Sequence, residues 1–306
     1  MEKGTSLWKD AWHRLAHNRA AIVSLGVLIV ILLLCFIGPL LPFVKSPTLI
    51  NLANSSAAPS TAHWFGTDPL GRDLFARVLY GGQVSLLVGL VATAVAVAIG
   101  VIYGAVAGYA GGKIDDLLMR FVDILFALPF LVLVILFALV VDKPASEFTE
   151  WVIQTTGIAR DRIAPITTLI PLFIAIGAIG WLTIARIVRA QVMAVKKQEF
   201  VEAAVSLGLS RTRILFRHIL PNVIGPIIIY TTLAVPGIML LESVLSFLGL
   251  GVKPPEPEWG LMLNTLRTAI YVNPWVAALP GAMIFAVSIC FNLLSDGMRS
   301  AMDIRN

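Results

Sequence analysis

Long apolar stretches alternate with short polar segments along the 306-residue chain. Six of these stretches reach the ~20 residues that a helix needs to cross a bilayer. Backbone polar groups in lipid must bond within their own segment, and no alternating strand pattern is present. We therefore expect an all-α polytopic membrane protein with six transmembrane helices, at residues 20–41, 84–109, 117–141, 166–188, 223–248 and 275–294.

Composition supports a membrane domain over a soluble one. The chain is 58% hydrophobic and 13% charged, whereas soluble domains average about 45–50% apolar and about 25% charged residues. Residues 20–306 are predicted to form one transmembrane domain, preceded by an amphipathic segment at 1–19. Cys35 and Cys290 both lie inside apolar runs. Because no CxxC or His/Cys cluster accompanies them, neither a metal site nor a disulfide is expected.

The distribution of charge predicts the orientation. With the N-terminus on one side, that side collects 15 Lys and Arg against 8 Asp and Glu, and the other side has 8 of each. The positive-inside rule then makes the richer side cytoplasmic, so both termini are expected there. The net charge of +5 is dispersed at the ends of apolar runs. This pattern favours contact with membrane lipid and gives no indication of a nucleic-acid partner.

The cytoplasmic loop 189–222 is the longest polar segment on that side. Good helix formers fill 198–207, Gly208 is placed to end a helix in a left-handed conformation, and Ser210 can cap a second helix. The predicted first helix has an apolar face of Phe200, Val201, Ala204 and Leu207. A helix this short needs a surface to pack on. The residues alone leave two interpretations open: a basic membrane-surface loop, or a docking site for a cytoplasmic partner.

The outer segment 42–80 is expected to become helical before the second span. Asp68 followed by Pro69 is typical of a helix start. Leu70, Leu74 and Val78 then recur every four residues, which predicts an interfacial amphipathic helix. The other outer loops are expected at 142–165 and 250–274.

Small and ionisable residues inside the spans are further candidates. Gly100, Gly104 and Gly108 recur every four residues, which favours close helix packing over lining a pathway. Asp123 and Glu242 are functional candidates because intramembrane acids are costly. For Asp123 the structural alternative is a pair with Arg120. Glu242 is a candidate for the translocation pathway or for pairing with a neighbouring subunit.

Arg186 and Arg189 lie at the membrane edge and are expected to contact lipid headgroups.

The order of residues in the cytoplasmic loop resembles a known signature. Glu202-Ala203-Ala204, then Gly208, then Leu220-Pro221 is similar to the loop of permease subunits of binding-protein-dependent ABC importers. His218 departs from the usual Ile of that family, but the form Arg217 to Asn222 resembles its peptide-importing branch. Segments 65–73, 245–251 and 291–299 are similar to those of C-type oligopeptide and dipeptide permease subunits.

This resemblance implies a type I ABC importer permease fold and an assembly. Its partners would be a homologous second permease, two cytoplasmic ABC ATPases and an extracytoplasmic binding protein. The loop would form the ATPase-coupling helix, with the candidate residues Glu199, Phe200, Glu202, Ala203, Ala204, Gly208, Leu220 and Pro221. Gly111-Gly112-Lys113 does not complete a Walker pattern. The chain is therefore not expected to be an enzyme, and ATP and Mg are expected on the partner ATPases.

The predicted function is import of oligopeptides or dipeptides by alternating access. The resemblance leaves nickel, glutathione and opines open as substrates of the same family. Two other classes also remain: an ion-coupled secondary transporter that uses Asp123 and Glu242 as a relay, and a membrane scaffold.

Overall fold

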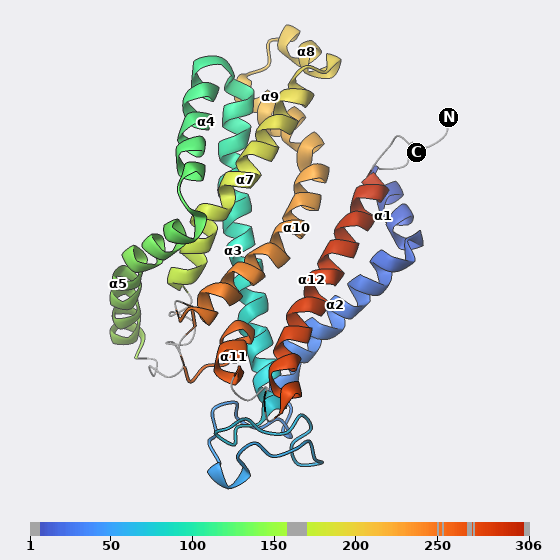
Figure 1. Cartoon of the computed structure of the whole chain (residues 1–306). Coiled ribbons are helices and arrows are strands. Elements are labelled where there is room, and N and C mark those ends of the chain that lie inside the picture. The colour runs from blue at the N-terminus through green and yellow to red at the C-terminus, as the bar shows by residue number, and fades with distance from the viewer. Residues whose placement is uncertain are drawn as a thin grey trace.

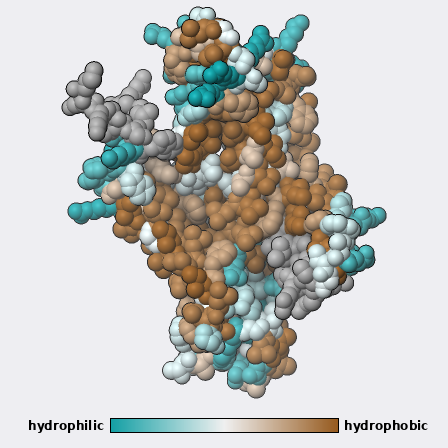
Figure 2. Space-filling model, turned by 180° about the vertical axis from the view of Figure 1, so that it is seen from behind, coloured by the Kyte–Doolittle hydropathy of each residue, from teal (hydrophilic) through white to brown (hydrophobic). Residues whose placement is uncertain are grey.

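The computed structural model describes residues 7–157, 170–249, 251–252, 254–267, 271 and 273–302. Over these residues the chain is helical, and its extended pairing is limited to one isolated bridge between Thr67 and Asp73. Five helices are long and apolar enough to span a membrane, or six if one bent pair counts as a span. Apolar residues cover the middle of the molecule, and hydrophilic ones gather toward its extremities (Figure 2). The predicted all-α polytopic architecture is confirmed.

Five predicted spans correspond to single long helices. These are α2 (Arg19–Ile37), α3 (Leu74–Ala110), α7 (Ile170–Lys196), α10 (Leu220–Phe247) and α12 (Pro274–Met302). In Figure 1, α3 runs through the length of the molecule beside α7, and α2 and α12 form a second pair. The N-terminal segment forms α1 (Leu7–His17), which packs on the last turns of α12 through Leu15 and Ala301.

The third predicted span is not one helix. It is divided into α4 (Gly112–Ala127) and α5 (Phe130–Thr156), whose axes differ by 96°. The break falls at Leu128 and Pro129. Proline lacks an N–H and disfavours helical geometry in the residue before it, and Leu128 is extended, with φ −83° and ψ 144°. Residues 142–156, expected in an outer loop, continue α5, and residues 158–165 of that loop lie outside the described residues.

The prediction that a helix begins at Asp68 is also wrong. Asp68 caps a turn, accepting hydrogen bonds from the N–H groups of Leu70 at 2.9 Å and Arg72 at 3.0 Å. Gly71 follows with φ +72°, and a Cβ there would collide with the carbonyl of Asn51. The left-handed residue stops any helix begun at Pro69. α3 begins instead at Leu74, after Asp73, whose carboxylate accepts the N–H of Ala76 at 2.9 Å.

The outer loop before α3 includes two short 3₁₀ turns, η1 (Gly38–Leu40) and η2 (Leu52–Asn54). Its buried anchor is Asp68, whose carboxylate pairs with Arg72 Nε at 2.7 Å. His63 contacts Asp73 at 2.7 Å and so fastens the loop to the first turn of α3.

Close contact between α3 and α7 organises the larger hydrophobic core. A Cβ on Gly100 would lie 2.8 Å from Ile184, and one on Gly108 would lie 2.7 Å from the carbonyl oxygen of Arg189. At Gly104 it would collide with the carbonyl of Ala185. Only glycine lets the two backbones approach this closely. The three glycines therefore lie in the packed interface between the helices.

A second core lies between α2, α3, α10, α12 and the short helix α11 (Trp259–Leu266). Trp259 is fully buried, and its indole Nε1 donates a hydrogen bond to the carbonyl of Val78 in α3 at 2.9 Å. Met239 of α10 packs in the same cluster. α3 belongs to both cores and joins them.

The α3–α7 contact predicts a position-specific effect of alanine. Gly104→Ala places a methyl group against the backbone of α7, so we expect a destabilisation of ~1–3 kcal/mol. Gly26→Ala is the matched control, because Gly26 is also helical but has nothing within 4 Å of an added Cβ. Thermal unfolding of the purified chain in mild detergent measures both, and equal midpoints for the two variants would contradict this packing.

Candidate functional site

A short helix, α8 (Glu199–Ser206), projects at one end of the molecule between α7 and α10 (Figure 1). Val201 and Ala204 on its inner side are buried in the larger core with Val195 of α7 and Ile214. The residues on the opposite side are exposed. Packing on one side supplies the tertiary support that an eight-residue helix requires.

Gly208 ends α8 as the sequence predicts. Its φ is +74°, its N–H donates to the carbonyl of Val205 at 2.9 Å, and the N–H of Leu209 donates to that of Ala204 at 3.3 Å. This pair of bonds is a Schellman motif, which satisfies the last carbonyls of the helix. A Cβ at Gly208 would meet nothing within 4 Å, so the positive φ alone favours glycine here.

The chain then enters the fifth span earlier than predicted. Ser210 caps α9 (Arg211–Ile214), accepting the N–H of Arg213 at 3.4 Å. A π-helical turn, η3 (Leu215–Ile219), joins α9 to α10 without a gap, so the helical rod runs from Arg211 to Phe247. Leu220 packs against the larger core, and Pro221 is exposed in the first turn of α10.

The predicted apolar face of α8 is divided between two surroundings. Val201 and Ala204 face inward, 2% and 4% exposed, and are unavailable to a partner. Phe200, Val205 and Leu207 are 39%, 58% and 79% exposed. The remaining candidates on this helix, Glu199, Glu202 and Ala203, are exposed as well. We call Phe200, Ala203, Val205 and Leu207 the α8 outer surface.

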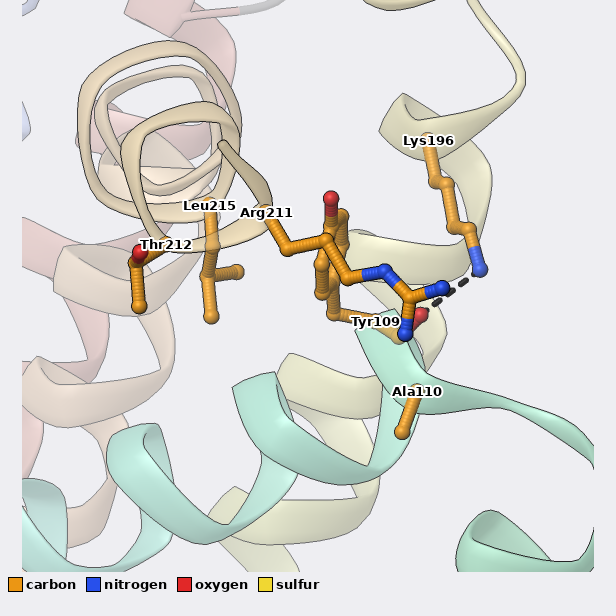
Figure 3. A pocket seen from close by; sticks show the side chains of 6 residues that line it. All are labelled: Tyr109, Ala110, Lys196, Arg211, Thr212 and Leu215. Carbon is orange, nitrogen blue, oxygen red and sulfur yellow. Dashed lines mark hydrogen bonds between the residues drawn. The ribbon is translucent and has the colours of Figure 1, made fainter. Parts of the chain in front are cut away.

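A basic pocket of about 360 Å³ lies beside α8, between the ends of α3 and α7 and the start of α9 (Figure 3). Lys196 Nζ donates to the Tyr109 carbonyl oxygen at 2.6 Å, and the Arg211 guanidinium extends toward the same carbonyl. The pocket is lined by Tyr109, Ala110, Lys196, Arg211, Thr212 and Leu215, none of them acidic. The pocket itself is therefore electropositive.

Two ion pairs hold α4 against α7. Arg189 makes two bonds of 2.5 Å to the carboxylate of Asp115, which is 4% exposed. Arg186 bonds Asp123 at 2.6 Å and lies over the ring of Phe126. The predicted pairing of Asp123 with Arg120 is therefore wrong, because Asp123 pairs with Arg186. Contact of Arg186 and Arg189 with lipid headgroups stays a prediction. The partners are 63 and 74 residues apart in sequence, so local spacing gives no signal for them.

An apolar groove of about 320 Å³ opens between α5, α7 and α10. Its polar groups include Thr183 of α7 and Tyr230 of α10. Gly180 and Gly237 also line it and add no side chain that would fill the space. Its lining is completed by Phe130, Ile184, Ile187, Leu233, Ala234, Ile238 and Leu241. Sequence reasoning missed this groove, because its walls come from three helices whose relative rotation no local pattern specifies.

Glu242 does not line the groove. Its side chain is fully buried in the described chain, where Ser246 Oγ donates to Glu242 Oε1 at 3.0 Å. Asp123 interacts with α7 instead, and its side chain is 63% exposed. The two intramembrane acids have different partners on different helices and do not form one site.

The fold, the exposed helix at one end and the groove between spans define an integral membrane transport component. Residues 100–305 match the family described as "Binding-protein-dependent transport system inner membrane component". Residues 6–59 match the "N-terminal TM domain of oligopeptide transport permease C". The chain belongs to the first family, whose members are inner-membrane permease subunits of binding-protein-dependent transport systems.

Similar proteins span almost the whole chain. The oligopeptide transport system permease protein OppC of Haemophilus influenzae is 40% identical over 98% of this chain and 89% of its own. The dipeptide transport system permease protein DppC of Bacillus subtilis is 38% identical, over 97% and 86%. A glutathione transport system permease protein, GsiD of Escherichia coli, is 38% identical, over 97% and 90%.

The two α4–α7 ion pairs predict unequal coupling energies. A double-mutant cycle on Asp115→Asn and Arg189→Gln should give about 1.5–3 kcal/mol, because the pair is bidentate and Asp115 is buried. The matched cycle on Asp123→Asn and Arg186→Gln should give about 0.2–1 kcal/mol, because that pair is exposed. Unfolding of the four single and two double variants in detergent measures both. A larger coupling for the exposed pair would contradict the geometry.

Proposed function

We propose that this chain forms half of the translocation pathway of an ATP-driven peptide importer, with α8 as its coupling helix. The observation that supports this is the continuity between α8 and the groove. α7 leads directly into α8, and α9, η3 and α10 lead directly away from it. α7 and α10 are also two of the three walls of the groove. A displacement of α8 therefore moves both walls.

The mechanism follows from that connection. A cytoplasmic ATPase binds the α8 outer surface and moves it when nucleotide closes the ATPase pair. The long helices transmit the motion, and the groove alternates between facing outward and inward. Such a switch needs contacts that differ between two states. In this proposal ATP and Mg are bound by the ATPase. This chain supplies the docking surface on α8 and the long helices α7 and α10 that transmit the motion.

The proposed assembly supplies what one chain lacks. The groove is open on one side, so a homologous second permease closes it. Two ATPases occupy the cytoplasmic side, where the basic pocket and α8 lie, in accord with the positive-inside rule. The extracytoplasmic binding protein delivers substrate at the opposite end, which includes the loop before α3.

Peptides are the proposed substrates, because two of the similar permeases are named for oligopeptides and dipeptides. The apolar walls of the groove can take up apolar side chains, and the hydroxyls of Thr183 and Tyr230 can hydrogen-bond a peptide backbone. Neither acid supports an ion relay, since Asp123 pairs with Arg186 and Glu242 is buried elsewhere.

If the ATPase docks on the α8 outer surface, a charged substitution there should release the ATPase, and the same substitution in the outer loop should not. Leu207→Glu places a charge on an apolar contact and should abolish co-purification of ATPase activity with the tagged chain from mild detergent. Leu52→Glu is the matched control: Leu52 is also exposed, at 67%, but belongs to the outer loop. Retained ATPase in Leu207→Glu, or equal loss in both variants, would show that α8 is not the docking site.

Peptide import predicts a defined energy source and competition pattern. Uptake of a labelled oligopeptide by cells that express the complete assembly should stop when ATP is depleted. It should persist when the proton gradient is collapsed and ATP is maintained. Excess unlabelled dipeptide or oligopeptide should compete, whereas nickel or an opine should not. Uptake that follows the proton gradient would indicate an ion-coupled carrier, and competition by glutathione alone would change the substrate class.

A further inference from the structure

Two glutamates meet in the interior where α3, α10 and α11 converge. Glu242 of α10 and Glu258, the residue before α11, are both 0% exposed, and their carboxyl groups lie within hydrogen-bonding reach of each other. The start of α11 is pressed onto α10 at this point, because a Cβ on Gly260 would collide with the backbone of Ser243. Two ionised carboxylates in contact and away from water would repel strongly.

Hydrogen-bond donors surround Glu258. Its Oε1 accepts from the Gly260 N–H at 2.5 Å and from Ser85 Oγ of α3 at 3.0 Å. Its Oε2 accepts from the Leu261 N–H at 2.7 Å. Donors at both oxygens match the acceptor-only form of a carboxylate. The N-terminus of α11 further stabilises the negative charge.

Glu242 has the opposite surroundings. Its Oε1 accepts the single proton of Ser246 Oγ at 3.0 Å. Ser246 Oγ in turn accepts the N–H of Val252 at 3.3 Å. Its Oε2 is buried and receives no hydrogen bond from any described residue. An ionised Oε2 would thus be a buried charged oxygen that no described residue donates to, beside a second negative charge. A proton on Oε2 removes both problems, because the acid can donate to Glu258.

We propose that Glu242 is a neutral carboxylic acid that holds a resident proton and donates it in a hydrogen bond to the ionised Glu258. The bond fixes the start of α11 on α10, and Ser85 extends the connection to α3. Glu242 is then a positioning residue for the outer end of the molecule. It does not act as a negative charge for a substrate amine. This assignment does not depend on which substrate the assembly transports.

The assignment predicts that amide substitution at the two positions has unequal effects. In Glu242→Gln, an NH₂ group takes the place of the protonated oxygen and can still donate to Glu258. In Glu258→Gln, an NH₂ group must face the N–H of Gly260 or of Leu261, and one of those donors loses its acceptor. The two changes are chemically identical, so each serves as the control for the other.

Thermal unfolding of the assembly purified in mild detergent tests this asymmetry. Glu242→Gln should keep the wild-type midpoint, whereas Glu258→Gln and Glu242→Ala should lower it by about 4 °C or more. Loss of stability or folding in Glu242→Gln to the same degree as in Glu258→Gln would overturn the proposal. Wild-type midpoints in all three variants would overturn the positioning role.

Two further measurements separate a proton from a bound cation. The infrared carbonyl band of a protonated carboxylic acid should be present in wild type and lost in Glu242→Gln. Raising the pH should remove the proton and lower the wild-type midpoint relative to that of Glu242→Gln, with Glu258 the titratable group that faces Glu242 among the described residues. A carbonyl band that Glu242→Gln leaves unchanged would show that Glu242 does not hold the proton. A wild-type midpoint raised by Na⁺ or Ca²⁺ at fixed pH would show two ionised carboxylates. Either result would overturn the assignment.

Discussion

The close approach of α3 and α7 is the contact on which the rest of the molecule depends. It requires side chains no larger than hydrogen at Gly100, Gly104 and Gly108, and it sets the rotation of α7 about its axis. That rotation determines which α7 residues face the groove and aims Arg189 at Asp115. It also fixes where α7 ends and therefore where α8 is held. Backbone contact along one line thus positions both the groove between the spans and α8 at one end of the molecule.

Sequence patterns predicted the features that are local. Apolar length identified the spans and four-residue spacing identified the glycine contact. Gly208 marked the end of α8, and Ser210 marked the start of α9. The third span and the helix expected at Asp68 were predicted wrongly for the same reason. The backbone conformation of one residue, Leu128 or Gly71, ends the helix, while the apolar pattern of the side chains continues past it. Hydropathy records what a side chain prefers and carries little information about a φ angle, so both breaks escaped it.

Non-local partners could not be derived in the same way. The acids Asp123 and Glu242 were recognisable as costly, but their partners are set by how distant helices cross. Glu258 carried a weak signal of its own, as an acid placed immediately before Trp259 and Gly260 at a helix start. Nothing in that segment indicates that its second neighbour is Glu242. The groove is similar, because its walls are contributed by α5, α7 and α10 and become contiguous only after packing.

The π-helical turn η3 has a geometric consequence. A π turn accommodates one residue more than an α-helical turn would, and each residue of an α-helix advances the helix by about 100°. The extra residue therefore sets the angle about the helix axis between α9, which follows α8, and the groove-facing side of α10. Deleting one residue from 215–219 would leave an unbroken helix of nearly the same length. It would also turn Tyr230 and Gly237 out of the groove and bring a different side of α10 into it, so this turn sets the rotation of α10 as a wall of the groove.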